Sequence, residues 1–124
     1  MKLFILEDNP NRIALFKTWF RGHDVDQVDT ADTAIKLLKE KKYDLILLDH
    51  DLGGDEMVDS REYNTGYTVA KAIPTTINKN TQAVVHSHNP VGSVKMVTEL
   101  VDNDVVYKPF GSFSQDILKL IKHE

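Results

Sequence analysis

Several short, continuous apolar runs of this chain each end in residues that can bind a metal ion or a phosphate. Residues 3–6 continue into Glu7-Asp8-Asn9, and residues 45–48 into Asp49-His50-Asp51. Residues 83–85 continue into His86-Ser87-His88-Asn89, and residues 105–107 into Lys108-Pro109. Short, fully apolar runs are typical of strands that are covered on both faces. If the strands are parallel neighbours, their polar residues meet at the carboxyl edge of the sheet, where open α/β sheets bind ligands.

Helical patterns separate the apolar runs. Asn9 and Thr30 are suited to cap helices, and Pro10 fits the first helical turn. The patterns predict strands at 3–6, 25–28, 45–48, 82–85 and 105–107, and helices at 10–21, 31–41, 66–73, 91–101 and 113–121. Residues 51–64 lack periodicity and contain Gly53-Gly54, which predicts a long loop. Strands that alternate with helices imply an α/β fold with a parallel five-stranded sheet and right-handed crossovers.

Large apolar side chains are expected to form the core of this fold. The helical patterns place an inward-facing set on the first and last helices: Phe16, Trp19, Phe20 and Leu118. In the fourth helix, Val94, Val97 and Val101 share one face of the pattern.

Size and composition limit the classes of function. With 124 residues the chain is expected to form a single domain, residues 1–124. Its net charge of -4 argues against DNA binding through a basic face, and the absence of cysteine removes thiolate chemistry. No signal peptide or membrane-spanning stretch is visible, so cytoplasmic residence is the expectation.

The acidic residues at the first and third strand ends predict a metal site. Glu7, Asp8 and Asp49 offer hard carboxylate oxygens, which suit Mg²⁺, Mn²⁺ or Ca²⁺. Asp49 follows four aliphatic residues, where an acid without a partner would be costly. Lys108 supplies a positive charge at the last strand end, either for a phosphate oxygen or for an ion pair with Asp49.

These motifs, in this order, resemble the receiver domain of the response-regulator family over essentially the whole chain. The resemblance implies a flavodoxin-like (βα)5 fold with strand order 2-1-3-4-5. It also implies that Glu7, Asp8 and Asp49 hold magnesium and that Asp49 is the phosphoacceptor. Ser87 would be the hydroxyl that contacts phosphate, and Lys108 the lysine that neutralises it.

The chain departs from ordinary receivers at two places. Asp49 and Gly66 are seventeen positions apart, about twice the usual spacing, and Gly53-Gly54 stand where a Met-Pro pair is common. The aromatic switch residue expected three positions before the lysine is replaced by Val105. These departures weaken the expectation that phosphorylation is coupled to an output surface.

The histidines are the third departure. His50 follows Asp49, and His86 and His88 flank Ser87, which resembles the receiver-like subset called cyclic-phosphate processing receivers. Imidazoles exchange protons near neutral pH, so His50 and His86 are expected to act as an acid–base pair, with His88 in reserve. Alternatively they ligate the metal, which would favour manganese, iron or zinc, or they pack in the core. Strand alternation also opposes His86 and Ser87 sharing one pocket unless the strand ends there.

Two functions follow as hypotheses. The first is a metal-dependent phosphoesterase for a cyclic phosphate or nucleotide, with Mg²⁺ or Mn²⁺ as cofactor and no membrane partner. Its residues would be Asp49, His50 and His86 for catalysis, Ser87 and Lys108 for phosphate, Glu7 and Asp8 with Asp49 for metal, and Asp51 and His88 as further candidates. The second is a stand-alone receiver phosphorylated on Asp49 in a two-component phosphorelay, with a histidine kinase and an output protein as partners. A third, weaker possibility is a receiver that only binds a nucleotide or a protein.

Overall fold

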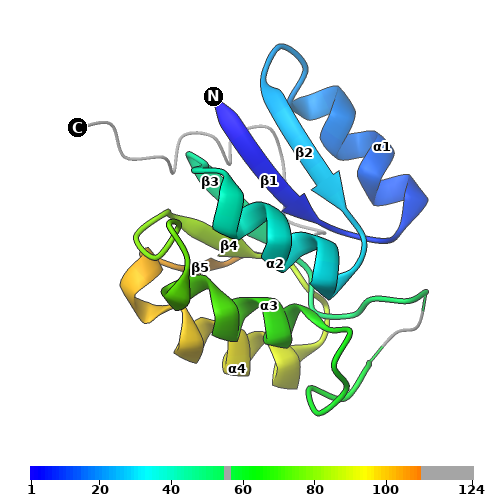
Figure 1. The fold of residues 1–124 in the computed structure, drawn as a ribbon. Helices are drawn as coiled ribbons and strands as arrows, with labels where there is room; N and C mark the ends of the chain where they lie inside the picture. Colours follow the sequence, from blue (N-terminus) through cyan, green and yellow to red (C-terminus); the bar gives the residue numbers. More distant parts are fainter. Residues whose placement is uncertain (55–56, 110–124) are drawn as a thin grey trace.

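The computed structural model describes residues 1–54 and 57–109, which form one α/β sheet structure (Figure 1). The elements in chain order are β1 (Lys2–Leu6), α1 (Pro10–Trp19), β2 (Asp24–Val28), α2 (Ala31–Glu40), β3 (Leu45–Leu48), α3 (Gly66–Ala72), the 3-10 turn η1 (Ile73–Thr75), β4 (Ala83–Val85), α4 (Pro90–Glu99), the 3-10 turn η2 (Val101–Asn103) and β5 (Val106–Tyr107). The helix expected at 113–121 lies outside the described residues. Asn9 and Thr30 cap α1 and α2 as predicted.

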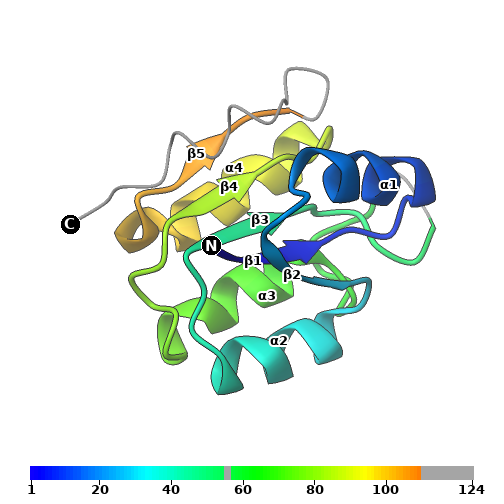
Figure 2. The same cartoon turned by 90° about the horizontal axis from the view of Figure 1, so that it is seen from above.

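The five strands are all parallel and have the order β2-β1-β3-β4-β5 (Figure 2). The predicted flavodoxin-like fold is therefore confirmed. One row of paired residues crosses four of the strands: Leu6, Leu48, Val85 and Tyr107. The residues that follow them form the next row: Glu7, Asp49, His86 and Lys108. Backbone hydrogen bonds continue into this row, because the N–H of Asp49 donates to Leu6 O at 3.0 Å and that of His86 to Leu48 O at 2.9 Å.

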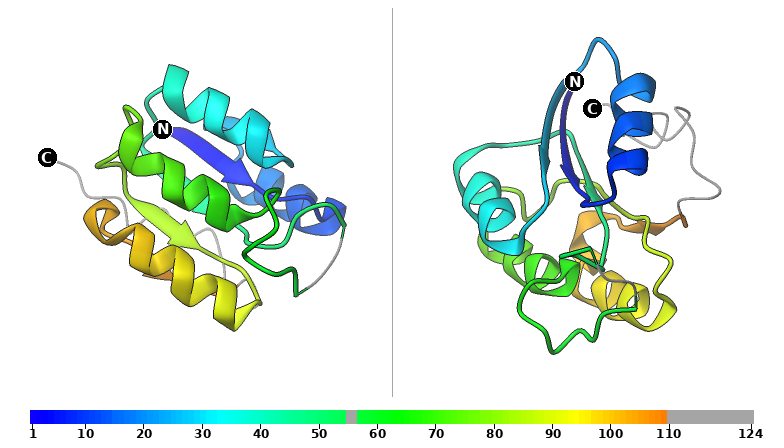
Figure 3. Two further views of the ribbon diagram at one scale, coloured as in Figure 1. Left: turned by 60° about the horizontal axis from the view of Figure 1, so that its bottom comes forward. Right: turned by 90° about the vertical axis from the view of Figure 1, so that its right-hand side faces the viewer.

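Helices cover both faces of the sheet (Figure 3). On one face α1 contributes Phe16 and Phe20, which pack on β1, β3 and β4, with Trp19 half-buried beside them. On the other face α2, α3 and α4 cover a larger cluster. Among the described residues this confirms the predicted core of the first helix. Leu118 lies outside the described residues.

Strand alternation extends past the strand ends and sorts the polar residues between these two faces. His86 lies on the α1 face, where its ring meets that of Phe16 edge-on at 5.2 Å between centroids. Ser87 lies on the α4 face, where its carbonyl accepts a hydrogen bond from Ser93 Oγ at 3.4 Å. His50 lies on the same side, against Gly92 of α4.

Helix α4 is rotated relative to the expectation from its valines. Val94 and Val101 are 66% and 72% exposed, whereas Val97 is half-buried against the core and Met96 and Leu100 are buried. Gly92 and Ser93 are buried as well, because the His50 ring occupies the space beneath the first turn of α4. The inward face thus begins with a small and a polar residue.

Within the described part of the chain, no helix is both long enough and apolar enough to cross a lipid bilayer.

Candidate functional site

Three carboxylates meet at the carboxyl edge of β1 and β3. One oxygen from each of Glu7, Asp8 and Asp49 lies within 4.8 Å of the others. Glu7 and Asp49 are buried, and Asp8 is half-buried at the rim. Because hard divalent cations prefer such oxygen ligands, this acidic trio fits Mg²⁺ or Mn²⁺.

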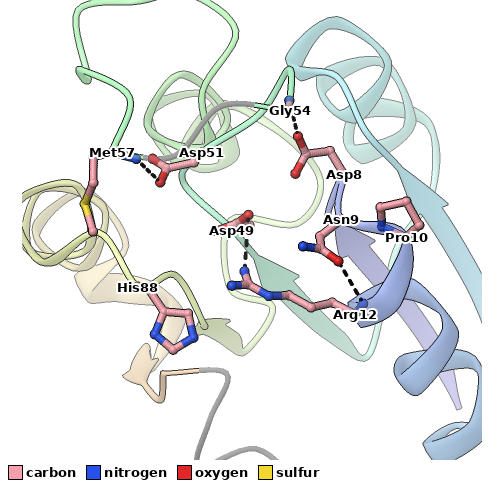
Figure 4. Close-up of a pocket in the computed structure, with 9 residues that line it drawn as sticks. All are labelled: Asp8, Asn9, Pro10, Arg12, Asp49, Asp51, Gly54, Met57 and His88. Carbon is pink, nitrogen blue, oxygen red and sulfur yellow. Dashed lines mark hydrogen bonds and ion pairs between the residues drawn. The ribbon is translucent and has the colours of Figure 1, made fainter.

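Backbone donors hold the acidic trio in place. Glu7 Oε2 accepts from the N–H groups of Asp8 at 3.1 Å and Asn9 at 3.3 Å, at the turn that leads into α1. Asp8 Oδ2 accepts from the Gly54 N–H at 2.6 Å, so the long loop is attached directly to the trio (Figure 4). Asp49 Oδ1 accepts from the His50 N–H at 2.8 Å.

Arg12 is the cation of the site, and the sequence patterns did not single it out. Its Nη1 lies 3.6 Å from Glu7 Oε1 and 3.9 Å from Asp49 Oδ2. The side chain extends from the first turn of α1 across the pocket toward Asp49 (Figure 4). The available signal was its place three residues after the capping Asn9, which puts it above the end of β1.

Burial and mutual repulsion set the protonation of the buried carboxylates. Burial, followed by the negative charge of Glu7, raises the pKa of Asp49 to about 8, although Arg12 opposes this. Burial also acts to raise the pKa of Glu7, but hydrogen bonds from His86 and Asp49 hold it at about 2. Burial raises the pKa of Asp8. Two adjacent buried carboxylates thus resist full ionisation unless a cation joins them.

The trio opens into a pocket of about 310 Å³. Its lining residues come from the β1–α1 turn, the end of β3, the long loop and the segment before α4: Asp8, Asn9, Pro10, Arg12, Asp49, Asp51, Gly54, Met57 and His88. His88 is exposed and lies across the pocket from the carboxylates (Figure 4). Of the predicted site residues, the structure therefore brings Asp8, Asp49, Asp51 and His88 to one pocket.

His50 and His86 lie elsewhere, and both are fully buried. His86 Nε2 is 3.2 Å from Glu7 Oε1. Because a carboxylate only accepts hydrogen bonds, the Nε2–H of His86 donates to Glu7. Burial lowers the pKa of His86, although Glu7 opposes this shift. His50 is enclosed beneath α4, where a Cβ on Gly92 would lie 2.4 Å from its ring. Neither ring lines the pocket, so direct proton exchange with a substrate, expected from the sequence, does not fit their positions.

Ser87 and Lys108 are also outside the pocket lining. The Ser87 side chain is fully buried, and its Oγ accepts from the Asn89 N–H at 3.0 Å. Lys108 is half-buried in the last row of the sheet, where its N–H donates to Val85 O at 2.9 Å. The ion pair of Asp49 is formed with Arg12.

Asp51 organises the long loop at the rim of the pocket. Its carboxylate accepts from the N–H groups of Met57 at 2.7 Å and Val58 at 3.1 Å, and from Asn89 Nδ2 at 3.0 Å. Burial tends to raise the pKa of Asp51, but hydrogen bonds from His50 and Asn89 hold it below its usual range. The extra length of the loop is therefore ordered around one carboxylate.

A parallel sheet of order 2-1-3-4-5 with an acidic trio at the ends of β1 and β3 defines a receiver domain. A family model described as the cyclic-phosphate processing receiver domain matches residues 1–102. The chain belongs to this family.

Solved receiver structures share the fold. One is a response regulator from Burkholderia pseudomallei with a phosphorylated aspartic acid, calcium ion and citrate, with a TM-score of 0.72 and 19% identity over 98% of this chain and 66% of that chain. A CheY-like receiver domain from Methanospirillum hungatei gives a TM-score of 0.72 and 15% identity over 95% and 87% of the two chains. The receiver domain of the sensor histidine kinase PA1611 from Pseudomonas aeruginosa, with magnesium coordinated in its active site cleft, gives 0.66 and 19% over 95% and 90%. No curated protein sequence matches the chain.

Proposed function

We propose that the protein is a divalent-metal-dependent phosphoesterase that opens cyclic phosphates. The observation that carries this proposal is that two carboxylates of the acidic trio, Asp8 and Asp49, line one pocket together with Arg12 and the exposed His88. Its volume of about 310 Å³ is in the range of small-ligand sites. The family description, cyclic-phosphate processing, supports this substrate class.

Glu7, Asp8 and Asp49 would hold Mg²⁺ or Mn²⁺. The bound ion would relieve phosphoryl charge and lower the pKa of a water molecule. Within the described residues the trio is formed by carboxylates alone, with His86 donating to Glu7 behind it. This favours hard cations over the iron or zinc that imidazole ligation would suggest.

The residues of the chain have distinct roles in the proposed reaction. Arg12 binds a phosphoryl oxygen, because its guanidinium already faces the anionic pocket. His88 exchanges the proton with water or with the leaving oxygen, since it is the exposed histidine of the lining. His86 orients Glu7, and His50 orients Asp51 and the loop; both act through these neighbours.

Turnover of a panel of 2′,3′-cyclic and 3′,5′-cyclic nucleotides with Mg²⁺ or Mn²⁺ tests the proposal. We expect turnover by the wild-type protein, and a loss of about 10²-fold or more in His88→Ala, the usual size of a general acid–base contribution. His23→Ala is the matched control, because His23 pairs with the chain amino terminus away from the pocket. A wild-type protein without turnover would refute the phosphoesterase, and full activity of His88→Ala would remove the role of that residue.

A second candidate function is a receiver phosphorylated on Asp49, served by a histidine kinase and an output protein. The observation in its favour is that Asp49 lies in the acidic trio and lines the pocket. Acetyl phosphate with Mg²⁺, followed by intact-mass analysis, tests it: one phosphoryl group that is absent in Asp49→Asn would favour signalling. Ser87 is buried and Val105 replaces the switch aromatic, so coupling to an output surface has less support.

A further inference from the structure

Behind the metal pocket, a hydrogen-bonded chain joins a carboxylate, an imidazole and a hydroxyl. His50 Nδ1 is 2.8 Å from Asp51 Oδ1, and His50 Nε2 is 2.8 Å from Ser60 Oγ. His50 is fully buried, whereas Ser60 is half-buried and lines two outer pockets of about 640 and 330 Å³. A serine at the surface is thus backed by a histidine and an aspartate in series, an arrangement that activates hydroxyl nucleophiles.

The partners of His50 determine where its proton lies. A carboxylate only accepts hydrogen bonds, so the 2.8 Å contact requires the proton on Nδ1. Asn89 Nδ2 also lies 3.3 Å from His50 Nδ1, but its two N–H groups donate to Asp51 Oδ1 and Val58 O, both at the shorter distance of 3.0 Å. In the neutral imidazole Nε2 is then an acceptor, and the Ser60 hydroxyl must donate to it. The geometry polarises the Ser60 O–H bond toward His50.

Burial of His50 restricts the chemistry that Ser60 can perform. The imidazole is 0% exposed, so it can take the hydroxyl proton but cannot pass it to a leaving group in the outer pockets. The leaving group must therefore depart as an anion, without a proton from His50. Cationic side chains lie beside Ser60 for such an anion: Lys95 lines both outer pockets, and Lys71 lines the larger one.

We propose that Ser60 is a second reactive centre that accepts an acyl group from an acyl phosphate. Ser60 Oγ forms a bond to the acyl carbon, and the bond from that carbon to the phosphate oxygen breaks. The hydroxyl proton goes to His50 Nε2. The phosphate leaves with the bonding electron pair beside Lys95 and takes up one proton from water, so that the product is hydrogen phosphate. No oxidant, metal ion or further reactant is required.

The test is incubation of the full chain with acetyl phosphate in the presence of EDTA, followed by mass spectrometric mapping of acetylated residues. EDTA prevents metal-dependent phosphorylation of Asp49, so this test is independent of the proposed function. We expect an O-acetyl group on Ser60, formed at least tenfold faster than on Thr18 and Thr98, two exposed helix hydroxyls in the same sample.

Variants separate activation from mere exposure. Ser60→Ala should remove this label, and Thr68→Ala should keep it, since Thr68 is another hydroxyl residue lining the larger outer pocket. Asp51→Asn should slow labelling of Ser60 at least tenfold, because it no longer fixes the proton on His50 Nδ1. Acetylation confined to lysines, a Ser60 rate equal to that of the two threonines, or an undiminished rate in a folded Asp51→Asn variant would overturn the proposal. The comparison of Ser60 with Thr18 and Thr98 is made within the wild-type protein, so it holds even if a variant does not fold.

Discussion

The buried pair Glu7 and Asp49 should make the metal-free protein less stable than a variant that lacks one charge. An aspartate titrates near 3.8 in the unfolded chain, and the pKa of Asp49 is raised to about 8 in the fold. Because the folded pKa is raised, Asp49 lowers the free energy of unfolding at every pH above 3.8. This loss of stability grows up to pH 8 by about 1.4 kcal/mol for each pH unit, and it reaches about 4 kcal/mol at pH 7.

Glu7 offsets part of this cost. Its pKa falls from 4.5 to about 2, which contributes about 3 kcal/mol at pH 7 and is lost as the pH falls through this interval. The hydrogen bond from Asp49 provides part of that contribution. Asp49→Asn removes the cost and some of the compensation, so we expect the metal-free variant to be about 1 to 4 kcal/mol more stable than the wild type.

Urea unfolding at pH 7, in EDTA and again in excess Mg²⁺, measures the loss of stability from the paired carboxylates and its relief by the metal ion. Mg²⁺ should stabilise the wild type by about 2.7 kcal/mol at a hundredfold excess over its dissociation constant, and Asp49→Asn much less. Asp44→Asn, which changes an exposed acid at the opposite end of β3, is the matched control and should show neither effect. A metal-free Asp49→Asn protein less stable than the wild type would refute the electrostatic reasoning.

Three further predictions concern the packing of α4 and the metal site. Gly92→Ala should lower the free energy of unfolding by about 1–3 kcal/mol, because the new Cβ would lie 2.4 Å from the His50 ring; Val94→Ala, on the exposed side of α4, should change it by less than about 0.5 kcal/mol in the same urea titration. Arg12→Ala should tighten Mg²⁺ binding in calorimetry while lowering turnover, since it removes a cation 3.9 Å from Asp49; weaker binding would contradict this. Mg²⁺ affinity should rise from pH 6 to pH 8 with release of a proton from Asp49, whose raised pKa lies at the top of this range; a pH-independent dissociation constant would count against it.

The sequence was sufficient for the fold and the acidic trio because both depend on local patterns. Short apolar runs between capped helices specify a parallel sheet, and residues that directly follow aligned strands must share a row. Glu7 and Asp49 are such residues, and the paired Leu6 and Leu48 before them fix their proximity.

The positions of the histidines depend on tertiary packing, which local sequence patterns do not specify. Strand alternation opposed a shared pocket for His86 and Ser87 unless the strand ended before them, and both were nevertheless expected at one site. In the structure they lie on opposite faces of the sheet, toward α1 and α4. The position of His50 could not be read in this way, because it depends on the packing of α4. The ring takes the volume beneath Gly92, and of the three valines that the pattern placed on one face, Val97 packs on the core whereas Val94 and Val101 are exposed.

Arg12 was missed for a related reason. The cap at Asn9 located the first turn of α1, but a long, flexible side chain reaches Asp49 only in the folded arrangement of β1, β3 and α1. In the sequence, Arg12 stands one turn into the first helix, directly after the acidic strand end. Charge balance supports this, since the buried trio needs a nearby cation.

The most direct test of a metal-dependent phosphoesterase is ³¹P NMR of the protein with 2′,3′-cyclic and 3′,5′-cyclic nucleotides and Mn²⁺. We expect the cyclic phosphodiester signal of at least one substrate to be replaced by a phosphomonoester signal. EDTA and Asp49→Asn should each prevent this change. Intact cyclic phosphate across the panel, or ring opening that persists in EDTA, would contradict the central claim.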